Sequence, residues 1–178
     1  MTKSVKLLRD QLKDAHGWLE ATMADVKEKN LNVVPPGKAN PLGASYAHAV
    51  MAEDGIVHGL LQGKMPLMAR DFAGKFGADK PMPQPGPEWA HYNEWTKDVK
   101  VNLRELREYA QAVYAASEAY IAGLTDEDLD KSIDFTNVGM GQKTLAWAIG
   151  TLVIGHLHDM TGEVSVLKGI QGLKGYPF

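Results

Sequence analysis

Two histidines are the residues of this sequence best placed to do chemistry. His48 and His156 each fall on the apolar stripe of an expected helix, so both would point into the interior of a helical bundle. Imidazole is a good ligand for Zn, Ni, Fe or Cu, and bundles commonly build metal sites from side chains on facing helices. The pair therefore predicts a histidine-centred pocket that holds a metal or a small molecule.

Met160 stands where a helical metal site would normally carry a further histidine. That position follows His156 by four residues, so its side chain points the same way. A thioether is a poor ligand for Zn or Ni and suits Cu(I) better. His158 does not replace it, because two residues correspond to a rotation of roughly 200° and should turn it outward. The residues leave two alternatives open: a metal-assisted enzyme, or a metal-free module for small-ligand binding or dimerisation.

Three further polar residues are candidates to orient the pair without ligating. Glu53 follows His48 by five residues and points away from it, and Glu163 lies one turn beyond Met160. His16 flanks the apolar stripe of the first helix. A lone histidine in such a position is more often a hydrogen-bonded core residue than part of a functional site. The other histidines are expected on the surface or in loops: His58, His91 and His158.

The helix that carries His48 has an unusual face of small residues. Ser45, His48, Ala52, Gly55 and Gly59 are spaced by three and four, so they share one stripe. Small side chains let a neighbouring helix approach closely or leave room for a ligand. His48 is the only large polar group on this stripe.

Four long helices are expected to position these residues. Apolar periodicity indicates helices from Thr2 or Ser4 to about residue 26, and over about 43–62, 88–123 and 144–168. Residues 32–43 are a connector with three prolines and two glycines, and residues 63–87 are a long loop with a short helix at most over 67–76. Three short segments are expected before the last helix: a capped turn over 124–130, a brief strand-like stretch over 131–136 and a turn-rich loop over 135–142. The pattern predicts an all-α four-helix bundle, with residues 1–178 as one domain.

Composition and motifs exclude several classes of function. The formal net charge of −3 provides no basic field for nucleic acid or anionic lipid. The chain has no cysteine, so it contains no disulfide and no thiolate ligand or nucleophile. Glycine-rich nucleotide loops, a phosphate loop and a serine nucleophile elbow are all absent. No apolar signal core or membrane span is found, which predicts a cytoplasmic protein.

Two segments resemble motifs of the DinB-like superfamily. Residues 46–54, Tyr-Ala-His-Ala-Val-Met-Ala-Glu-Asp, resemble its His-x-x-x-x-Glu-Asp segment. Residues 155–164, Gly-His-Leu-His-Asp-Met-Thr-Gly-Glu-Val, resemble its closing motif, His-x-x-x-His-x-Gly-Glu/Gln-Ile. The resemblance extends over most of the chain, and helix order and motif spacing agree.

This resemblance implies an up-down-down-up four-helix bundle, a homodimer, and a divalent metal such as Zn or Ni held by three histidines. His48 and His156 match two of the ligand positions, and Met160 occupies the third. Characterised relatives are transferases and isomerases that use a low-molecular-weight thiol as cosubstrate on a small electrophile. The apolar tail, Tyr176-Pro177-Phe178, is a candidate docking segment, or simply packs against its own bundle.

Overall fold

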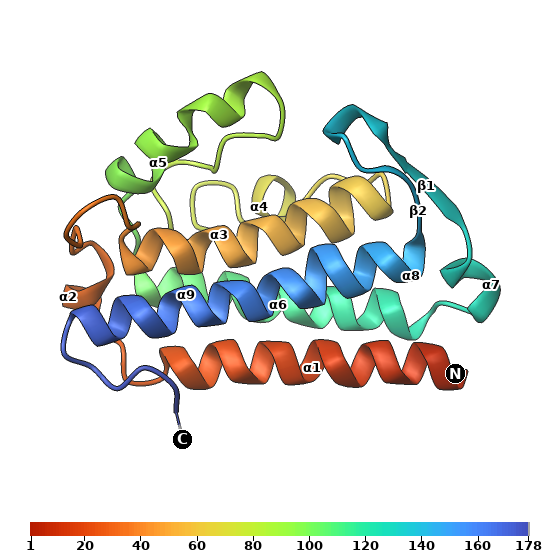
Figure 1. Cartoon of the computed structure of the whole chain (residues 1–178), viewed down its shortest axis with the longest axis horizontal. Helices are drawn as coiled ribbons and strands as arrows, with labels where there is room; N and C mark the ends of the chain where they lie inside the picture. Colours follow the sequence, from red (N-terminus) through yellow and green to blue (C-terminus); the bar gives the residue numbers. More distant parts are fainter. Residues whose placement is uncertain (178) are drawn as a thin grey trace.

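Long helical rods form the body of the molecule (Figure 1). The computed structural model describes residues 1–177, and Phe178 lies outside the described residues. The first rod is α1 (Lys3–Met23); the second is α3 (Leu42–Asp54), continued by the π-helix η1 (Gly55–Leu61). The third is α6 (Leu103–Ala122), and the fourth joins α8 (Leu145–Trp147), the π-helix η4 (Ala148–Gly155) and α9 (His156–Ile170). The predicted four-helix bundle is confirmed.

The rods run in the order up, down, down, up. In Figure 1, α1 and α9 run in one direction, whereas α3 and α6 run in the other. Both α1 and α3 pack against α6 and α9, which places the core between the four rods. Since α3 and α6 are parallel, the chain must return along the bundle between them, and residues 62–102 make that crossover.

Capping side chains start two of the rods at the expected places. The Thr2 side chain accepts a hydrogen bond from the Val5 N–H, and Thr144 accepts one from the Trp147 N–H. Each satisfies a backbone donor that has no partner in the first turn of a helix. The predicted stripe of α1 faces inward, and its fully buried members include Leu12, Ala15 and Leu19.

The expected continuous helix over 88–123 is wrong. The segment is divided into the 3-10 helix η2 (Pro87–His91), the short helix α5 (Tyr92–Asp98) and α6. Val101 forms an isolated antiparallel bridge with Ala78, so the backbone is extended there. The Asn102 side chain then accepts from the Glu105 N–H and starts a new helix. Tertiary pairing and a cap therefore override the helical periodicity.

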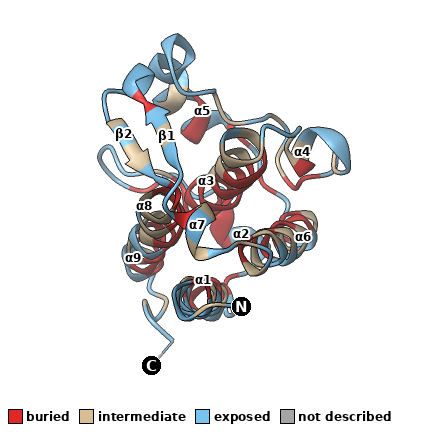
Figure 2. Cartoon of the chain, turned by 90° about the vertical axis from the view of Figure 1, so that its right-hand side faces the viewer, coloured by how far each residue is buried: buried red, intermediate tan, exposed pale blue. Residues whose placement is uncertain are grey.

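Shorter elements flank the bundle. They are α2 (Glu28–Leu31), α4 (Leu67–Arg70) and α7 (Asp126–Leu129). An antiparallel hairpin of β1 (Ser132–Phe135) and β2 (Gly141–Thr144) pairs residue 132 with 144, and the 3-10 turn η3 (Thr136–Val138) joins its strands. In Figures 1 and 2 the hairpin and α5 rise on the same side of α3, and their outer parts are largely exposed.

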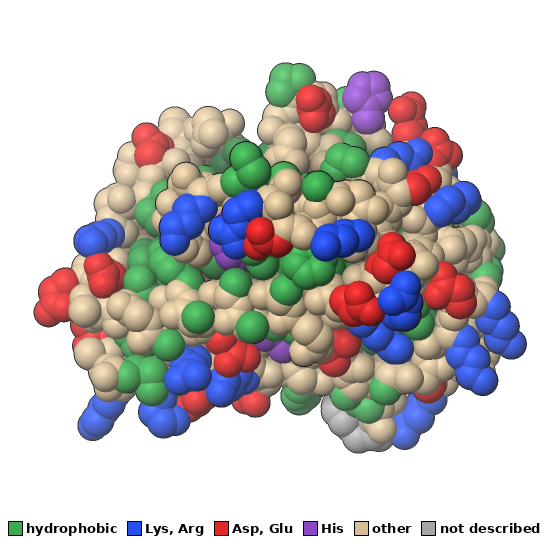
Figure 3. Space-filling model, turned by 180° about the vertical axis from the view of Figure 1, so that it is seen from behind, with side chains coloured by type: hydrophobic (Ala, Val, Ile, Leu, Met, Phe, Trp, Pro, Cys, Tyr) green, Lys and Arg blue, Asp and Glu red, His purple; other side chains and the backbone are tan. Residues whose placement is uncertain are grey.

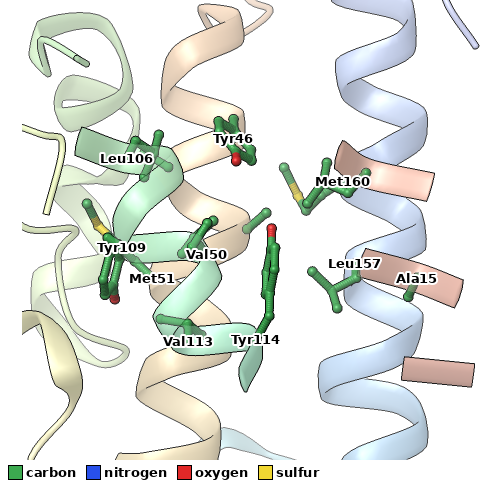
Figure 4. Close-up of a cluster of buried hydrophobic side chains, with 14 of the residues drawn as sticks. Ala15, Tyr46, Val50, Met51, Leu106, Tyr109, Val113, Tyr114, Leu157 and Met160 are labelled. Carbon is green, nitrogen blue, oxygen red and sulfur yellow. The ribbon is translucent and has the colours of Figure 1, made fainter. Parts of the chain in front are cut away.

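The core is apolar with a few buried polar groups. Figure 4 shows Tyr46, Val50, Tyr114 and Leu157 meeting from three rods.

Over the described part of the chain, no helix is long and apolar enough to cross a membrane. Near the C-terminus, a Cβ on Gly175 would lie 2.6 Å from Ser165 Oγ, so this glycine packs closely against α9. Docking by the tail stays a prediction, and Phe178 lies outside the described residues.

Candidate functional site

The structure brings His48 and His156 into direct contact. Nε2 of His48 lies 2.9 Å from Nε2 of His156, a hydrogen-bond distance, and the ring centroids are 4.9 Å apart. Only one of the two facing nitrogens can carry a proton in such a bond, because the other must accept. His48 lies on α3 and His156 is the first residue of α9, so the bond joins two antiparallel rods.

Burial keeps both imidazoles neutral at pH 7. Burial, and to a lesser extent the charge of neighbouring His156, lower the pKa of His48 to about 3. Burial also lowers the pKa of His156, and the negative charges of Asp159, Glu163 and Glu53 offset part of that shift. Nδ1 of His48 is buried and has no hydrogen-bond partner among the described residues. The pair is therefore an uncharged donor–acceptor unit in an apolar setting.

A cavity of about 680 Å³ opens beside the pair. Its floor is the small-residue stripe of α3 and η1, with Ala52, Gly55 and Gly59 lining it. A Cβ built on Gly55 would meet no atom of the described residues within 4 Å, so this position faces open space. The stripe therefore leaves room for a ligand, one of the two outcomes expected from its small side chains.

The crossover and the hairpin supply the cavity walls, which sequence reasoning did not assign to the site. The crossover and the start of α4 contribute Met68, Met82 and Trp89, and the hairpin contributes Phe135 and Val138. The Trp89 ring stacks on Tyr92 with centroids 4.5 Å apart, and both rings pack edge-on near His48. A proline- and methionine-rich loop was the available signal, but only tertiary structure shows that it covers the histidines.

The third family position does not complete a metal site. Met160 is only 6% exposed and lies among core residues such as Tyr46 and Leu157 (Figure 4). Within residues 1–177, no three His, Cys, Asp or Glu side chains form a group that could hold a metal. A ligating histidine also usually donates its other N–H to a carboxylate or carbonyl, and over the same residues Nδ1 of His48 has no such partner. The donor set does not fit a three-histidine centre, and ligation by His48 and His156 stays a prediction.

The candidate supporting residues bond elsewhere. Nε2 of His16 lies 3.0 Å from each Glu53 carboxylate oxygen, and the His16 ring stacks on Tyr114. This confirms the interpretation of His16 as a hydrogen-bonded core histidine. Glu163 accepts from Ser45 Oγ at 2.7 Å and from Asn40 Nδ2 at 3.2 Å. Orientation of the pair by His16, Glu53 or Glu163 stays a prediction, because among the described residues no hydrogen bond joins them to it.

His58 is buried within η1, although it was predicted on the surface or in a loop. It is 5% exposed, and its Nδ1 lies 2.8 Å from an Asp54 carboxylate oxygen. Asp54 also accepts from the N–H groups of Leu67 and Met68 and from the Tyr109 hydroxyl. The spacing of Asp54 and His58, i and i+4 on a helix, was the signal for this pair. His91 and His158 are exposed, as predicted.

Surface charge is mixed rather than concentrated. On the face seen in Figure 3, acidic and basic side chains are interspersed, with hydrophobic side chains between them. The described residues of this face present no extended basic patch of the kind that binds nucleic acid.

Comparison with known proteins settles the family. The sequence model of the DinB superfamily matches residues 11–160. The chain belongs to the DinB superfamily. This DinB-superfamily protein has no match among curated proteins.

Two solved structures share its fold. One is a conserved protein from Enterococcus faecalis, with a TM-score of 0.78 and 21% identity over 96% of this chain and 98% of the other. The other is YfiT from Bacillus subtilis, with a TM-score of 0.62 and 15% identity over 98% of this chain and 91% of the other. YfiT is described as a probable metal-dependent hydrolase with an unusual four-helix bundle topology. At these identities the likeness shows the fold alone.

Proposed function

We propose that this protein binds a small organic molecule in the cavity beside His48 and His156, without a metal ion held by the pair. The observation that carries the proposal is the cavity itself, about 680 Å³, with one buried and one half-buried imidazole among its few polar groups. Ligand sites are typically concave, mainly apolar and furnished with a few polar groups that orient the ligand. This favours the ligand-binding alternative over dimerisation as the role of the pair.

The metal-assisted transferase is the second candidate. The family resemblance favours it, and the description of YfiT as a probable metal-dependent hydrolase supports the metal but not the transfer reaction. It needs a third ligand that Met160 supplies poorly, since thioether sulfur has low affinity for Zn or Ni. Met160→His would add an imidazole one turn after His156. We expect this variant to bind Zn more tightly than the unmodified protein, measured by isothermal titration with metal-stripped samples. The thiol cosubstrate and the homodimer stay predictions.

Elemental analysis of protein purified without an affinity tag separates the two candidates. We expect less than stoichiometric metal before and after dialysis against Zn or Ni. Near-stoichiometric metal that disappears in His48→Ala would overturn the metal-free proposal and support the enzyme.

Ligand binding is tested by NMR on protein labelled at the methionine methyl groups. Met51, Met68 and Met82 line the cavity, whereas Met23 is buried in the core and serves as an internal reference. A fragment collection that contains neutral, anionic and cationic members should yield ligands that shift the three cavity methyls and leave Met23 unchanged. If no fragment of any class shifts them, the cavity is not a binding site.

Variants that fill the cavity provide the matched control. Gly55→Leu projects a side chain into open space in the cavity, and Gly17→Leu makes the same change on the exposed face of α1. We expect Gly55→Leu to abolish the fragment-induced shifts and Gly17→Leu to preserve them. Ala52→Leu, also on the cavity floor, repeats the test if Gly55→Leu does not fold. Unchanged binding in both cavity variants would contradict the proposal.

A further inference from the structure

We propose that the occupant of this cavity is an uncharged, mainly apolar molecule with one hydrogen-bonding group, such as a hydroxyl, that meets the His48–His156 pair. This inference rests on the proposed function and adds the chemical class of the ligand. It is carried by the composition of the cavity lining and by the partners of the nearby charged groups.

Within the described part of the chain, no Lys, Arg, Asp or Glu is among the residues that line the cavity. The polar side chains of this described lining are the two histidines and the amides of Gln84 and Asn137. Its other members are apolar residues or glycine. A charged ligand group would have to leave water without an opposite charge to meet it, which is strongly unfavourable. The lining therefore selects against both anions and cations.

Three of the carboxylates near the pair already have partners, and a fourth, Asp159, is exposed and does not line the cavity. Glu53 is hydrogen-bonded to His16, and Glu163 to Ser45 and Asn40. Asp54 accepts from two backbone N–H groups and the Tyr109 hydroxyl, and His58 lies beside it. Recruiting any of them to a cationic ligand would break a contact that holds the bundle or the crossover in place. None of these three carboxylates is therefore free to meet a cation inside the cavity.

The walls fit an apolar body of variable shape. Met51, Met68 and Met82 are unbranched and polarisable, and such side chains adapt to irregular or aromatic surfaces. Trp89 is 40% exposed while also lining the cavity, and Leu60 and Val138 are likewise exposed apolar members of the lining. These three residues come from η2, η1 and η3, so apolar surface continues from the interior to the mouth.

The imidazole pair supplies the polar end of the site. The two Nε2 atoms are bonded to each other and Nδ1 of His48 is buried, so a ligand hydroxyl would meet Nδ1 of His156 or replace the Nε2–Nε2 bond. A hydroxyl suits either place because it can both donate and accept. A thiol cosubstrate that carries sugar hydroxyls or carboxylates would instead leave many polar groups facing methionine, proline and aromatic side chains. Such a cosubstrate is therefore disfavoured by the same lining.

A matched series of naphthalene derivatives tests the inference by the methionine-methyl assay. The probes are 2-naphthalenemethanol, 2-naphthoate, 2-naphthylmethylammonium and naphthalene. We expect the alcohol to bind most tightly and both ions to bind at least about tenfold more weakly, equivalent to about 1.4 kcal/mol or more. His156→Leu should remove the advantage of the alcohol over naphthalene while naphthalene still binds, which shows that the variant is folded.

The outcomes distinguish this inference from the proposed function. Equal or tighter binding of either ion would overturn the ligand class, while the cavity would remain a binding site. Equal binding of naphthalene and its alcohol would overturn the role given to the hydrogen-bonding group. If none of the four probes binds but other fragments shift Met51, Met68 and Met82, the class is wrong and the proposed function stands. If nothing shifts these methyls, the proposed function fails and the inference fails with it.

Discussion

Nε2 of His16 lies 3.0 Å from both carboxylate oxygens of Glu53, so a buried polar pair joins α1 to α3 through the core. Nδ1 of His16 has no partner among the described residues, which leaves Nε2 as the nitrogen that holds the ring in place. The pair thus fixes two rods relative to each other beside the cavity floor.

Removing one member of this pair should destabilise the protein strongly. Glu53→Ala leaves a buried histidine N–H without its acceptor, and an unsatisfied buried hydrogen-bonding group typically costs about 1–3 kcal/mol. Urea unfolding should show that loss. The double variant His16→Phe/Glu53→Leu should lose less stability than the summed losses of the single variants His16→Phe and Glu53→Leu. Additive effects of the single variants would show that the contact does not couple the two residues.

Asp54→Asn should loosen the crossover. Asp54 accepts from the backbone N–H groups of Leu67 and Met68, so it holds the start of α4 against α3. Loss of its charge weakens these hydrogen bonds and the contact with His58, and hydrogen exchange at Leu67 and Met68 should be roughly tenfold faster. Asp71→Asn is the control, because Asp71 lies nearby in an exposed ion pair with Arg70. Similar exchange in both variants would argue against an anchoring role for Asp54.

Gly77→Ala should be far more destabilising than Gly74→Ala. Both glycines have positive φ, +82° and +73°, so alanine should cost about 1–2 kcal/mol at either position. A Cβ on Gly77 would also lie 2.2 Å from the Leu106 backbone nitrogen, whereas a Cβ on Gly74 meets no described atom within 4 Å. Overpacking should add about 1–3 kcal/mol or more for Gly77→Ala alone, as measured by urea unfolding. Equal losses would mean that the crossover does not pack tightly on α6.

Stability should fall as the pH is lowered from about 6.5 toward 3. In the folded protein the pKa of His48 is about 3, below its ordinary value of 6.5, so the unfolded chain takes up the proton first. His48 alone should remove about 2 kcal/mol between pH 7 and pH 5, and the lowered pKa of His156 acts in the same direction. His48→Gln should flatten this dependence, and His91→Gln, at an exposed position, should not. The same pH slope in all three proteins would contradict neutral burial of His48.

The bundle could be predicted from the sequence because its rods obey a simple periodicity. The stripes of α1 and of the last rod, and the caps Thr2 and Thr144, are local signals. The break between α5 and α6 could not be predicted in this way, because it depends on the pairing of Val101 with Ala78 across the crossover.

The site was predictable only in part. Helical spacing identified His48 and His156, but it carried no information on which long loop would cover them. The cavity walls include Met82 and Trp89 of the crossover and Phe135 of the hairpin, two segments that are far apart in the sequence. Pairing of Glu53 with His16 likewise required the three-dimensional arrangement, because 37 positions separate the two residues.

The π-helices η1 and η4 contact each other beside the cavity, one on each of the rods that carry the histidines. Wider turns of this kind commonly originate from a single-residue insertion into an α-helix, and each inserted residue rotates the next part of the helix by about 100°. Loss of one residue within Ala148–Gly155 would therefore turn α8 and the hairpin relative to His156, while leaving both histidines in the chain. Across the superfamily, single-residue gaps in these two short segments should mark the members whose binding pockets have been reshaped.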